Sequence, residues 1–254
     1  MPARLDVSDL GLCVLAEPLT VAAFAPFGDV IENPRPDVQP GQYGEAFGSV
    51  LSAAPFHPVS ANQGSAIKYQ HVSRLADRYA ADGAPSGQPS AAVANVFVCA
   101  ARTLVEDPEH SRHGGAGLFP VTILERHPYT TQTFVPLTAR GNTRYLVIVA
   151  PTLASNGPSS SQRDRRGPPD VHNLRAFVAR GDQAVTYGAG TWHAPMAALG
   201  ASGTSVAYAV FQFANGVGPE DCQETVLDGG SRAQQQPWSA VTVRVPATGC
   251  VAKL

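Results

Sequence analysis

The sequence predicts a mainly β protein whose short strands form a sandwich or a closed barrel, with few helices. The chain of 254 residues holds 24 glycines and 22 prolines, which favours many turns over long helices. Runs rich in Val, Ile, Tyr, Phe and Thr recur between turn clusters at a spacing of about ten residues, as in all-β domains. Apolar residues make up 44% of the chain, which is enough to bury a sizeable core. We expect residues 1–254 to form a single domain.

Each expected strand is a run of β-branched and aromatic residues between turn signals. The runs are Leu12–Ala16, Ala94–Ala100, Val121–Arg126, Gln132–Leu137, Tyr145–Val149, Leu174–Val178, Gln183–Tyr187, Ser205–Phe213 and Val241–Val245. Two short helices are predicted: Thr20 can cap a turn that ends at Phe24, and Ser73 can cap a helix through Ala81. A polar, proline-rich stretch at about residues 151–170 is expected to be a mobile insertion, and about residues 228–254 an extended tail.

Composition excludes several classes of partner and site. The net charge is −2 and no basic stripe stands out, which argues against nucleic acid and anionic membrane as partners. No apolar run reaches the length of about 18 residues that a membrane span needs. The 4 cysteines are far apart and form no paired motif, so the sequence predicts a reduced, intracellular protein without a structural zinc site.

A first polar cluster lies in the segment from Val121 to Leu137. Glu125 and His127 are two residues apart and point to the same face of a strand. Gln132 opens the next strand and can face the same cavity if the two strands pair antiparallel. A solvated polar face of a surface strand is the competing interpretation of this spacing.

A second polar residue follows a glycine turn. His193 comes next to Trp192 and shortly after Gly190, at the start of a strand. This position suits the wall of a pocket. The competing interpretation is a buried histidine that is satisfied by a backbone carbonyl.

The two segments together resemble the motifs of the cupin family. Glu125 and His127 stand at the positions of the two cupin histidines, Gln132 stands at the glutamate position, and Gly141 lies a little beyond the expected glycine. The second motif ends in Gly, two residues and His, as does the segment before His193. The resemblance implies a cupin-like antiparallel β-barrel of the jelly-roll type, with a few short helices and the site inside. This ligand set can hold a divalent metal more weakly than a site with three histidines, or it can form a metal-free acid–base site.

Several longer motifs resemble the ureidoglycolate lyase family, also called ureidoglycolate hydrolase, and in particular its fungal branch. They occur in family order from about Leu15 to Val226: FAPFGDVI at 24–31, NQGSAIKY at 62–69, LERHPYTTQTFVPL at 124–137, GTWHAPM at 190–196 and EDC at 220–222. The resemblance implies cleavage of (S)-ureidoglycolate to glyoxylate and urea in allantoin degradation. The residues that it assigns to catalysis are Lys68, Glu125 and His193, and those that it assigns to substrate binding are Tyr69, His127 and Gln132.

The individual roles stay open at this point. Glu125 or His193 can serve as the base, and Lys68 can hold the substrate carboxylate, act as an acid, or simply be an exposed partner of a salt bridge. A metal site would use Glu125, His127, Gln132 and His193. A different function is a non-catalytic or metal-dependent cupin that binds a small carboxylate. By analogy with barrels that pair sheet edges between subunits, we expect a homodimer.

The last three residues predict where the protein is found. Ala252–Lys253–Leu254 resembles the Ser-Lys-Leu address that an import receptor reads at a free C-terminus. Lys253 and Lys68 are the only lysines among 18 basic residues, which makes a chance lysine at this position less frequent. We therefore expect a peroxisomal protein, and otherwise a cytoplasmic one.

Overall fold

The computed structural model describes residues 2–48, 56–107, 117–138, 142–153, 167–230 and 240–247, and it is built mainly of strands. The strands are β1 Ala3–Asp6, β2 Leu12–Leu15, β3 Glu17–Pro18, β4 Gly28–Ile31, β5 Val59–Ala61, β6 Ala66–Lys68, β7 Ala91–Arg102, β8 Gly117–Pro120, β9 Ile123–Arg126, β10 Gln132–Pro136, β11 Arg144–Ala150, β12 Arg175–Arg180, β13 Ala184–Tyr187, β14 Trp192–His193, β15 Ala197–Leu199, β16 Ser205–Ala214, β17 Gln223–Asp228 and β18 Val241–Val245. The helices are α1 Val21–Phe24, α2 Tyr43–Phe47 and α4 Gly218–Asp221, with the 3-10 turns η1 Pro40–Gln42, η2 Asn62–Gly64 and η3 Val171–Asn173. None of the helices in these ranges is long and apolar enough to cross a membrane.

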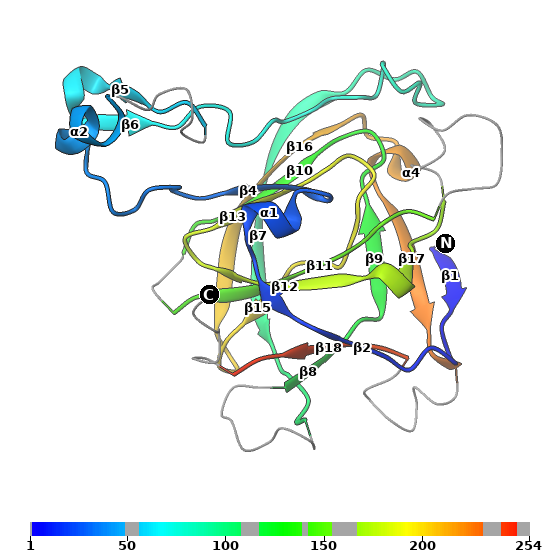
Figure 1. The fold of residues 1–254 in the computed structure, drawn as a ribbon. Helices are drawn as coiled ribbons and strands as arrows, with labels where there is room; N and C mark the ends of the chain where they lie inside the picture. The colour runs from blue at the N-terminus through cyan, green and yellow to red at the C-terminus, as the bar shows by residue number, and fades with distance from the viewer. Residues whose placement is uncertain are drawn as a thin grey trace.

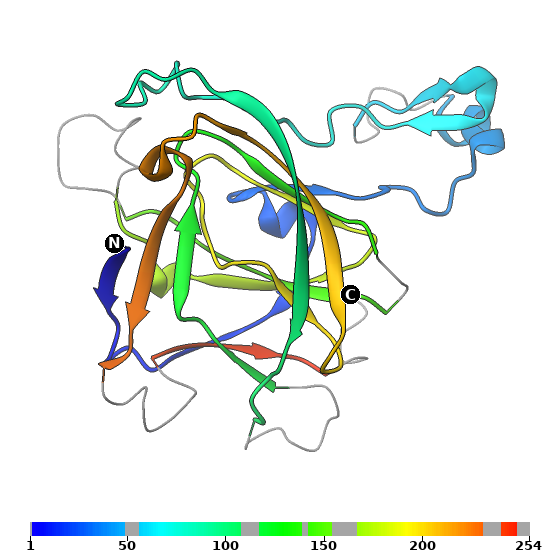
Figure 2. The ribbon, with the colours of Figure 1, turned by 180° about the vertical axis from the view of Figure 1, so that it is seen from behind.

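One 13-stranded sheet curls around the centre of the molecule (Figures 1 and 2). Its main path runs β1-β17-β9-β14-β11-β15-β7-β16-β10-β13-β4, and within the described ranges this path does not close into a ring. Most neighbouring strands are antiparallel, with parallel pairs such as β1 with β17 and β15 with β7. The structure therefore has the predicted cupin-like β fold with a few short helices, as a curled open sheet rather than a closed barrel.

Strand β11 separates two hydrophobic cores, which explains its uninterrupted apolar sequence. Leu146 and Ile148 face one core, which the small sheet β2-β18-β8 covers, whereas Tyr145 and Val147 face the core inside the curled sheet. Strand β18 has buried valines and pairs with β2 and β8, so the predicted tail contains a core strand. The other parts of the predicted tail and insertion lie largely outside the described residues.

The expected strands are confirmed, and so is the first of the two expected helices, because the Ala23 N–H donates to the Thr20 hydroxyl at the start of α1. The second helix, Ser73–Ala81, is wrong. Ser73 donates instead to the Asp29 carboxylate at 3.0 Å, and Asp77 forms a β-bridge with Thr130. Docking of this segment on the sheet overrides its weak helical propensity.

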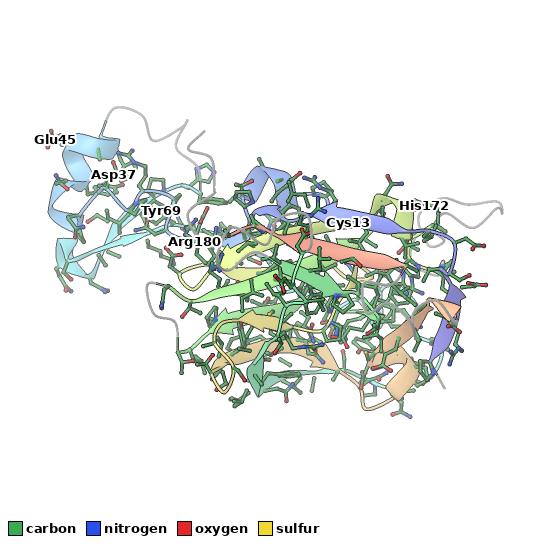
Figure 3. The ribbon with its side chains drawn as sticks, turned by 90° about the horizontal axis from the view of Figure 1, so that it is seen from below. Cys13, Asp37, Glu45, Tyr69, His172 and Arg180 are labelled. Atoms are coloured by element: carbon green, nitrogen blue, oxygen red, sulfur yellow. The ribbon has the colours of Figure 1, made fainter. Side chains whose placement is uncertain are left out.

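An arm, here residues 33–48 and 56–71, projects from the curled sheet between β4 and the segment that leads into β7 (Figures 1 and 2). It holds α2 and the β5–β6 hairpin, and its elements pack mainly on one another. Phe47 is the buried centre of the arm, and the rings of Tyr43 and Tyr69 lie 5.5 and 6.2 Å from it. Seen from below, Tyr69 lies in the arm beside the curled sheet rather than inside it (Figure 3).

Candidate active site

The fold brings four of the predicted site residues together: Glu125, His127, Gln132 and His193. Glu125 on β9 lies directly across from His193 on β14 in an antiparallel pair, and Gln132 opens β10. The Nε2 atom of His193 is 3.6 Å from the Glu125 carboxylate and 3.2 Å from the Gln132 amide oxygen. The rings of His127 and His193 lie 5.5 Å apart. A polar cluster thus sits at one end of the inner core.

His127 is a buried neutral imidazole with one nitrogen free for chemistry. Its Nδ1 lies 2.6 Å from the backbone carbonyl oxygen of Asp221, and this carbonyl can only accept. The proton therefore resides on Nδ1, which leaves a lone pair on Nε2. Nε2 is buried and has no hydrogen-bond partner among the residues that the structure describes. Burial, and next the charge of His193, lower the pKa of His127 to about 4.

His193 is surrounded by oxygen acceptors on both sides of its ring. Nδ1 lies 2.9 Å from the Thr191 carbonyl, and Nε2 faces the Gln132 amide oxygen and the Glu125 carboxylate. This arrangement suits the imidazolium form, in which both nitrogens donate and Glu125 is the counter-ion. The ring of Tyr187 stacks on that of His193 at 4.0 Å and fixes its orientation.

Glu125 is the part of this cluster that solvent reaches, because 20% of its side chain is exposed. Burial by itself raises the pKa of its carboxyl group. The hydrogen bond from His193 and the charge of that ring outweigh burial, so the pKa lies below its ordinary value. The carboxylate form is therefore the stable partner of His193.

Sequence reasoning missed several residues that complete the cluster. Gln212 on β16 accepts a hydrogen bond of 2.8 Å from the Gln132 amide and thereby orients it. Cys222 and Glu224 lie beside Glu125, with ligand atoms of the three residues within 4.8 Å of one another. A polar Gln inside the apolar run SVAYAVFQFA was the available signal for Gln212.

The cluster also has the donor atoms of a metal site. The ligand atoms of Glu125, His127 and His193 lie within 4.8 Å of one another, and the unpartnered Nε2 of His127 is one of them. Two imidazoles and a carboxylate suit a divalent transition metal. Gln132 adds a neutral amide oxygen at 3.2 Å from His193.

The other two predicted site residues, Lys68 and Tyr69, lie in the arm. Lys68 ends β6 and is exposed, whereas Tyr69 packs against Phe47 and its buried hydroxyl has no partner within the described ranges. The structure thus does not bring these two residues to the Glu125–His193 pair of the same chain (Figures 1 and 3).

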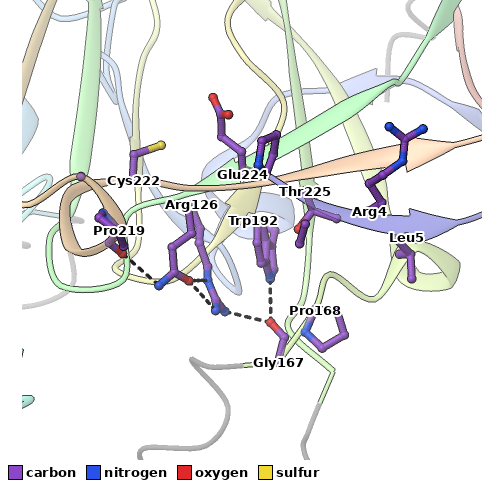
Figure 4. Close-up of a pocket in the computed structure, with 14 residues that line it drawn as sticks. Arg4, Leu5, Arg126, Gly167, Pro168, Trp192, Pro219, Cys222, Glu224 and Thr225 are labelled. Atoms are coloured by element: carbon purple, nitrogen blue, oxygen red, sulfur yellow. Dashed lines mark hydrogen bonds between the residues drawn. The ribbon is translucent and has the colours of Figure 1, made fainter. Parts of the chain in front are cut away.

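Arg126 follows Glu125 in the chain but belongs to the opposite face of β9. It lines a cavity of about 700 Å³, whose other lining residues include Trp192, Gln223, Cys222 and Glu224. The Arg126 side chain lies on the side of Trp192 and Gly167, whereas the Glu224 side chain points away from them (Figure 4). Its guanidinium donates to Gln223 and to the Gly167 carbonyl and stacks on Trp192 at 4.4 Å. Arg126 therefore supplies no positive charge to the cluster around Glu125.

Comparison with known proteins identifies the family. The family model described as ureidoglycolate lyase matches residues 12–234. A protein of Schizosaccharomyces pombe named ureidoglycolate lyase is 36% identical over 211 residues, which cover 83% of this chain and 89% of that protein. A protein of the same name from Saccharomyces cerevisiae is 34% identical, and the match covers 74% of this chain and 79% of that protein. One from Burkholderia mallei is 35% identical, and the match covers 72% of this chain and 74% of that protein. By this match over most of its length, the chain belongs to the ureidoglycolate lyase family.

Proposed function

We propose that this protein is a lyase that cleaves (S)-ureidoglycolate to glyoxylate and urea, a reaction of allantoin and purine degradation. Membership of the ureidoglycolate lyase family supports this activity. The observation that carries the proposal is the buried, unpartnered Nε2 atom of His127 opposite the Glu125–His193 pair. An acid (His193), its counter-ion (Glu125) and a nitrogen with a free lone pair (His127) are thus close together.

The reaction sets three chemical tasks. One carbon of the substrate bears a hydroxyl group, a ureido nitrogen, a carboxylate and a hydrogen. A base removes the hydroxyl proton while the carbonyl forms, an acid protonates the nitrogen of the departing urea, and a cation holds the carboxylate. Water is not consumed, so the step is an elimination and not a hydrolysis.

His127 is the base in this proposal. The sequence left this role between Glu125 and His193, but Nε2 of His193 already faces Glu125 and Gln132, whereas Nε2 of His127 has no partner. A substrate carboxylate near His127 favours its protonated form and raises the pKa of His127 above its value of about 4. Substrate binding therefore makes His127 a stronger base.

His193 is the acid, and Glu125 stabilises its charged form. As the bond between carbon and ureido nitrogen breaks, the bond electrons move to the nitrogen, and Nε2 of His193 donates its proton there. The hydroxyl proton ends on Nε2 of His127. One proton is taken up and one is given, so the products are neutral urea and the glyoxylate anion. Gln132, held by Gln212, is placed to orient the ureido group.

One divalent metal ion also fits the cluster. Glu125, His127 and His193 would hold it, with Gln132 as a fourth ligand. Such an ion supplies Lewis-acid polarisation of a substrate oxygen. Metal analysis of the purified protein, and turnover after chelation and readdition of divalent ions, test this part of the proposal. Full activity without bound metal refutes a metal requirement.

The experiment for the activity itself measures urea and glyoxylate after incubation with ureidoglycolate. Glu125→Ala and His193→Ala are each expected to lower turnover by about 10²–10⁴-fold, as for general acid–base groups. Asp182→Ala is the matched control, because Asp182 is an exposed carboxylate in the turn between β12 and β13. Near-normal turnover of either site variant removes that residue from the mechanism. Glyoxylate binding without turnover by the wild type supports the alternative of a binding protein.

We further propose that the protein is a homodimer. Support comes from the apolar outer surface of the sheet, where Val96 and Val98 on β7 are 68% and 70% exposed. Monomeric proteins rarely leave such residues together in water. Sedimentation at micromolar concentration tests the oligomeric state, and a monomer as the only species refutes this proposal.

A further inference from the structure

We propose that the arm delivers Lys68 to the active site of a second copy of this chain, which packs against the outer face of β7, β16 and β10. In this arrangement Lys68 binds the substrate carboxylate in trans. The inference rests on the proposed function, because the carboxylate is that of the proposed substrate. Four observations support it.

The first observation is that the solvent-facing side chains on the outer face of these three strands are apolar, since the only polar one in the rows described below, Thr133 beside Phe211, is buried. The register places Ala209 between Val135 and Val96, and the next row holds Ala207 and Val98. Leu137 donates its N–H to Ala207 and continues that row. A neighbouring row includes Phe211, of which 37% is exposed. A face of this composition gains free energy when a partner covers it and removes it from water, as in a protein–protein interface.

The second observation is the free edge of β7. The pairing with β16 covers Ala91 to Ala100, but β15 pairs with β7 only at Ala101 and Arg102. Within the described part of the chain, most of this 12-residue strand therefore has one unpaired edge, and its sequence up to Ala101 contains no charged residue. Proteins normally protect such an edge with charges, prolines or a partner. A second copy related by a twofold axis brings an identical apolar face and edge, so the contact is self-complementary.

The third observation is that, among the described residues, the only cation that the active site offers is His193, and Glu125 already balances its charge. The charged groups that act on Glu125 and His127 are these two residues and His193. Arg126 points to the other face of β9, as Figure 4 shows. Glu224 adds a second carboxylate close to Glu125. A substrate with a carboxylate needs a compensating positive charge here, and an incoming lysine supplies it.

The fourth observation is the position of the arm. It stands away from the curled sheet on the side of β16 and β7, and its elements pack mainly on one another (Figures 1 and 2). Lys68 is exposed at the end of the β5–β6 hairpin. A subunit packed on the apolar face lies next to this arm. Charge complementarity between Lys68 and the carboxylates Glu125 and Glu224 then identifies the occupant as a second copy rather than an unrelated protein.

Mixing two inactive variants tests the delivery in trans. Lys68→Ala and His193→Ala proteins are each expected to be nearly inactive. After they are unfolded together and refolded at equal concentration, half of the dimers are mixed, and each mixed dimer holds one site with both residues intact. We expect about a quarter of wild-type turnover, as the statistics of a twofold dimer require. If Lys68 acts within its own chain, both sites of a mixed dimer are defective. A mixture that recovers no turnover therefore overturns the proposal. Full turnover of Lys68→Ala overturns it as well.

A crosslinking experiment gives a readout that does not depend on activity. Lys68→Cys combined with Glu224→Cys places one thiol on the arm and one beside Glu125. Both variants are made in a Cys13→Ser, Cys222→Ser background, which removes the exposed thiol of Cys13 and the native thiol beside Glu224. Mild oxidation is then expected to produce a species of twice the chain mass on a non-reducing gel, and neither single variant in that background should produce it. A disulfide within one chain, or no disulfide, overturns the proposal. Failure of the wild type to cleave ureidoglycolate, with this crosslink present, refutes the proposed function alone.

Charged substitutions locate the interface. Val96→Asp combined with Val98→Asp is expected to give a monomer and to lower turnover to the level of Lys68→Ala, while the circular dichroism spectrum is unchanged. Leu15→Asp is the matched control, because Leu15 is 60% exposed on β2, outside the proposed face. Dissociation by Leu15→Asp and not by the β7 variant overturns the choice of face.

Discussion

Acidification is predicted to destabilise this protein through the buried imidazole of His127. In the unfolded chain a histidine has a pKa of 6.5, whereas burial and the charge of His193 lower the pKa of His127 to about 4 in the folded protein. Between these two values the unfolded chain binds a proton that the folded protein does not bind. Stability is therefore complete above pH 6.5 and falls as the pH decreases toward 4.

The size of the effect follows from the two pKa values. A difference of about 2.5 pH units corresponds to about 3 kcal/mol of unfolding free energy, a substantial part of what a domain usually has. Glu125 acts in the same direction at lower pH, because its folded pKa lies below the ordinary value and its stabilising pair is lost as the carboxylate is protonated. Of these two residues, only His127 accounts for the loss of stability that begins below pH 6.5.

The assay is urea unfolding at pH 7, 6, 5 and 4, followed by the fluorescence of the buried Trp192. We expect the wild type to lose stability over this range and His127→Gln to lose about 3 kcal/mol less, since glutamine does not titrate. His57→Gln is the control, because His57 is exposed in the arm. An equally steep loss in His127→Gln refutes the assignment of His127 as a buried neutral histidine.

Three further predictions concern the core, the orientation of Gln132 and the destination of the protein. Phe177 is fully buried, so Phe177→Ala is expected to lower the unfolding free energy by about 3–5 kcal/mol in urea. Gln212→Leu leaves the Gln132 amide without its acceptor, and steady-state kinetics should show a KM that rises more than kcat falls. We propose peroxisomal import by the Ala252–Lys253–Leu254 sequence, which lies outside the described residues; a fluorescent protein fused ahead of the chain should be punctate, and diffuse after Lys253 and Leu254 are deleted.

Strands that are long and apolar could be predicted from the sequence, and the short ones could not. Strand β11 is the clearest case, because both of its faces are buried and its sequence is uninterrupted. Strands β14 and β15 have two and three residues and no period to detect. Strand β17 was not predicted, because its sequence QETVLD mixes charged and β-branched residues. The false helix at Ser73–Ala81 had the right spacing, but its side chains bind the sheet instead.

The site could be predicted where its residues share one strand face or follow a glycine turn. Glu125 and His127 were found by their spacing, and His193 by the turn at Gly190. The contact that fixes the tautomer of His127 comes from the Asp221 carbonyl, and a backbone acceptor leaves no mark on residue type. No local pattern could place Lys68 either, because the position of the arm depends on the folded sheet.

One structural feature links the chemistry of the site to its sensitivity to acid. Nε2 of His127 keeps its lone pair because burial and His193 oppose protonation, and the same opposition makes the folded protein lose stability as the pH falls. A bound carboxylate offsets the charge of His193 and so removes part of that opposition. The part of the acid destabilisation that comes from the charge of His193 therefore also favours an anionic ligand and, with it, transfer of the hydroxyl proton to His127.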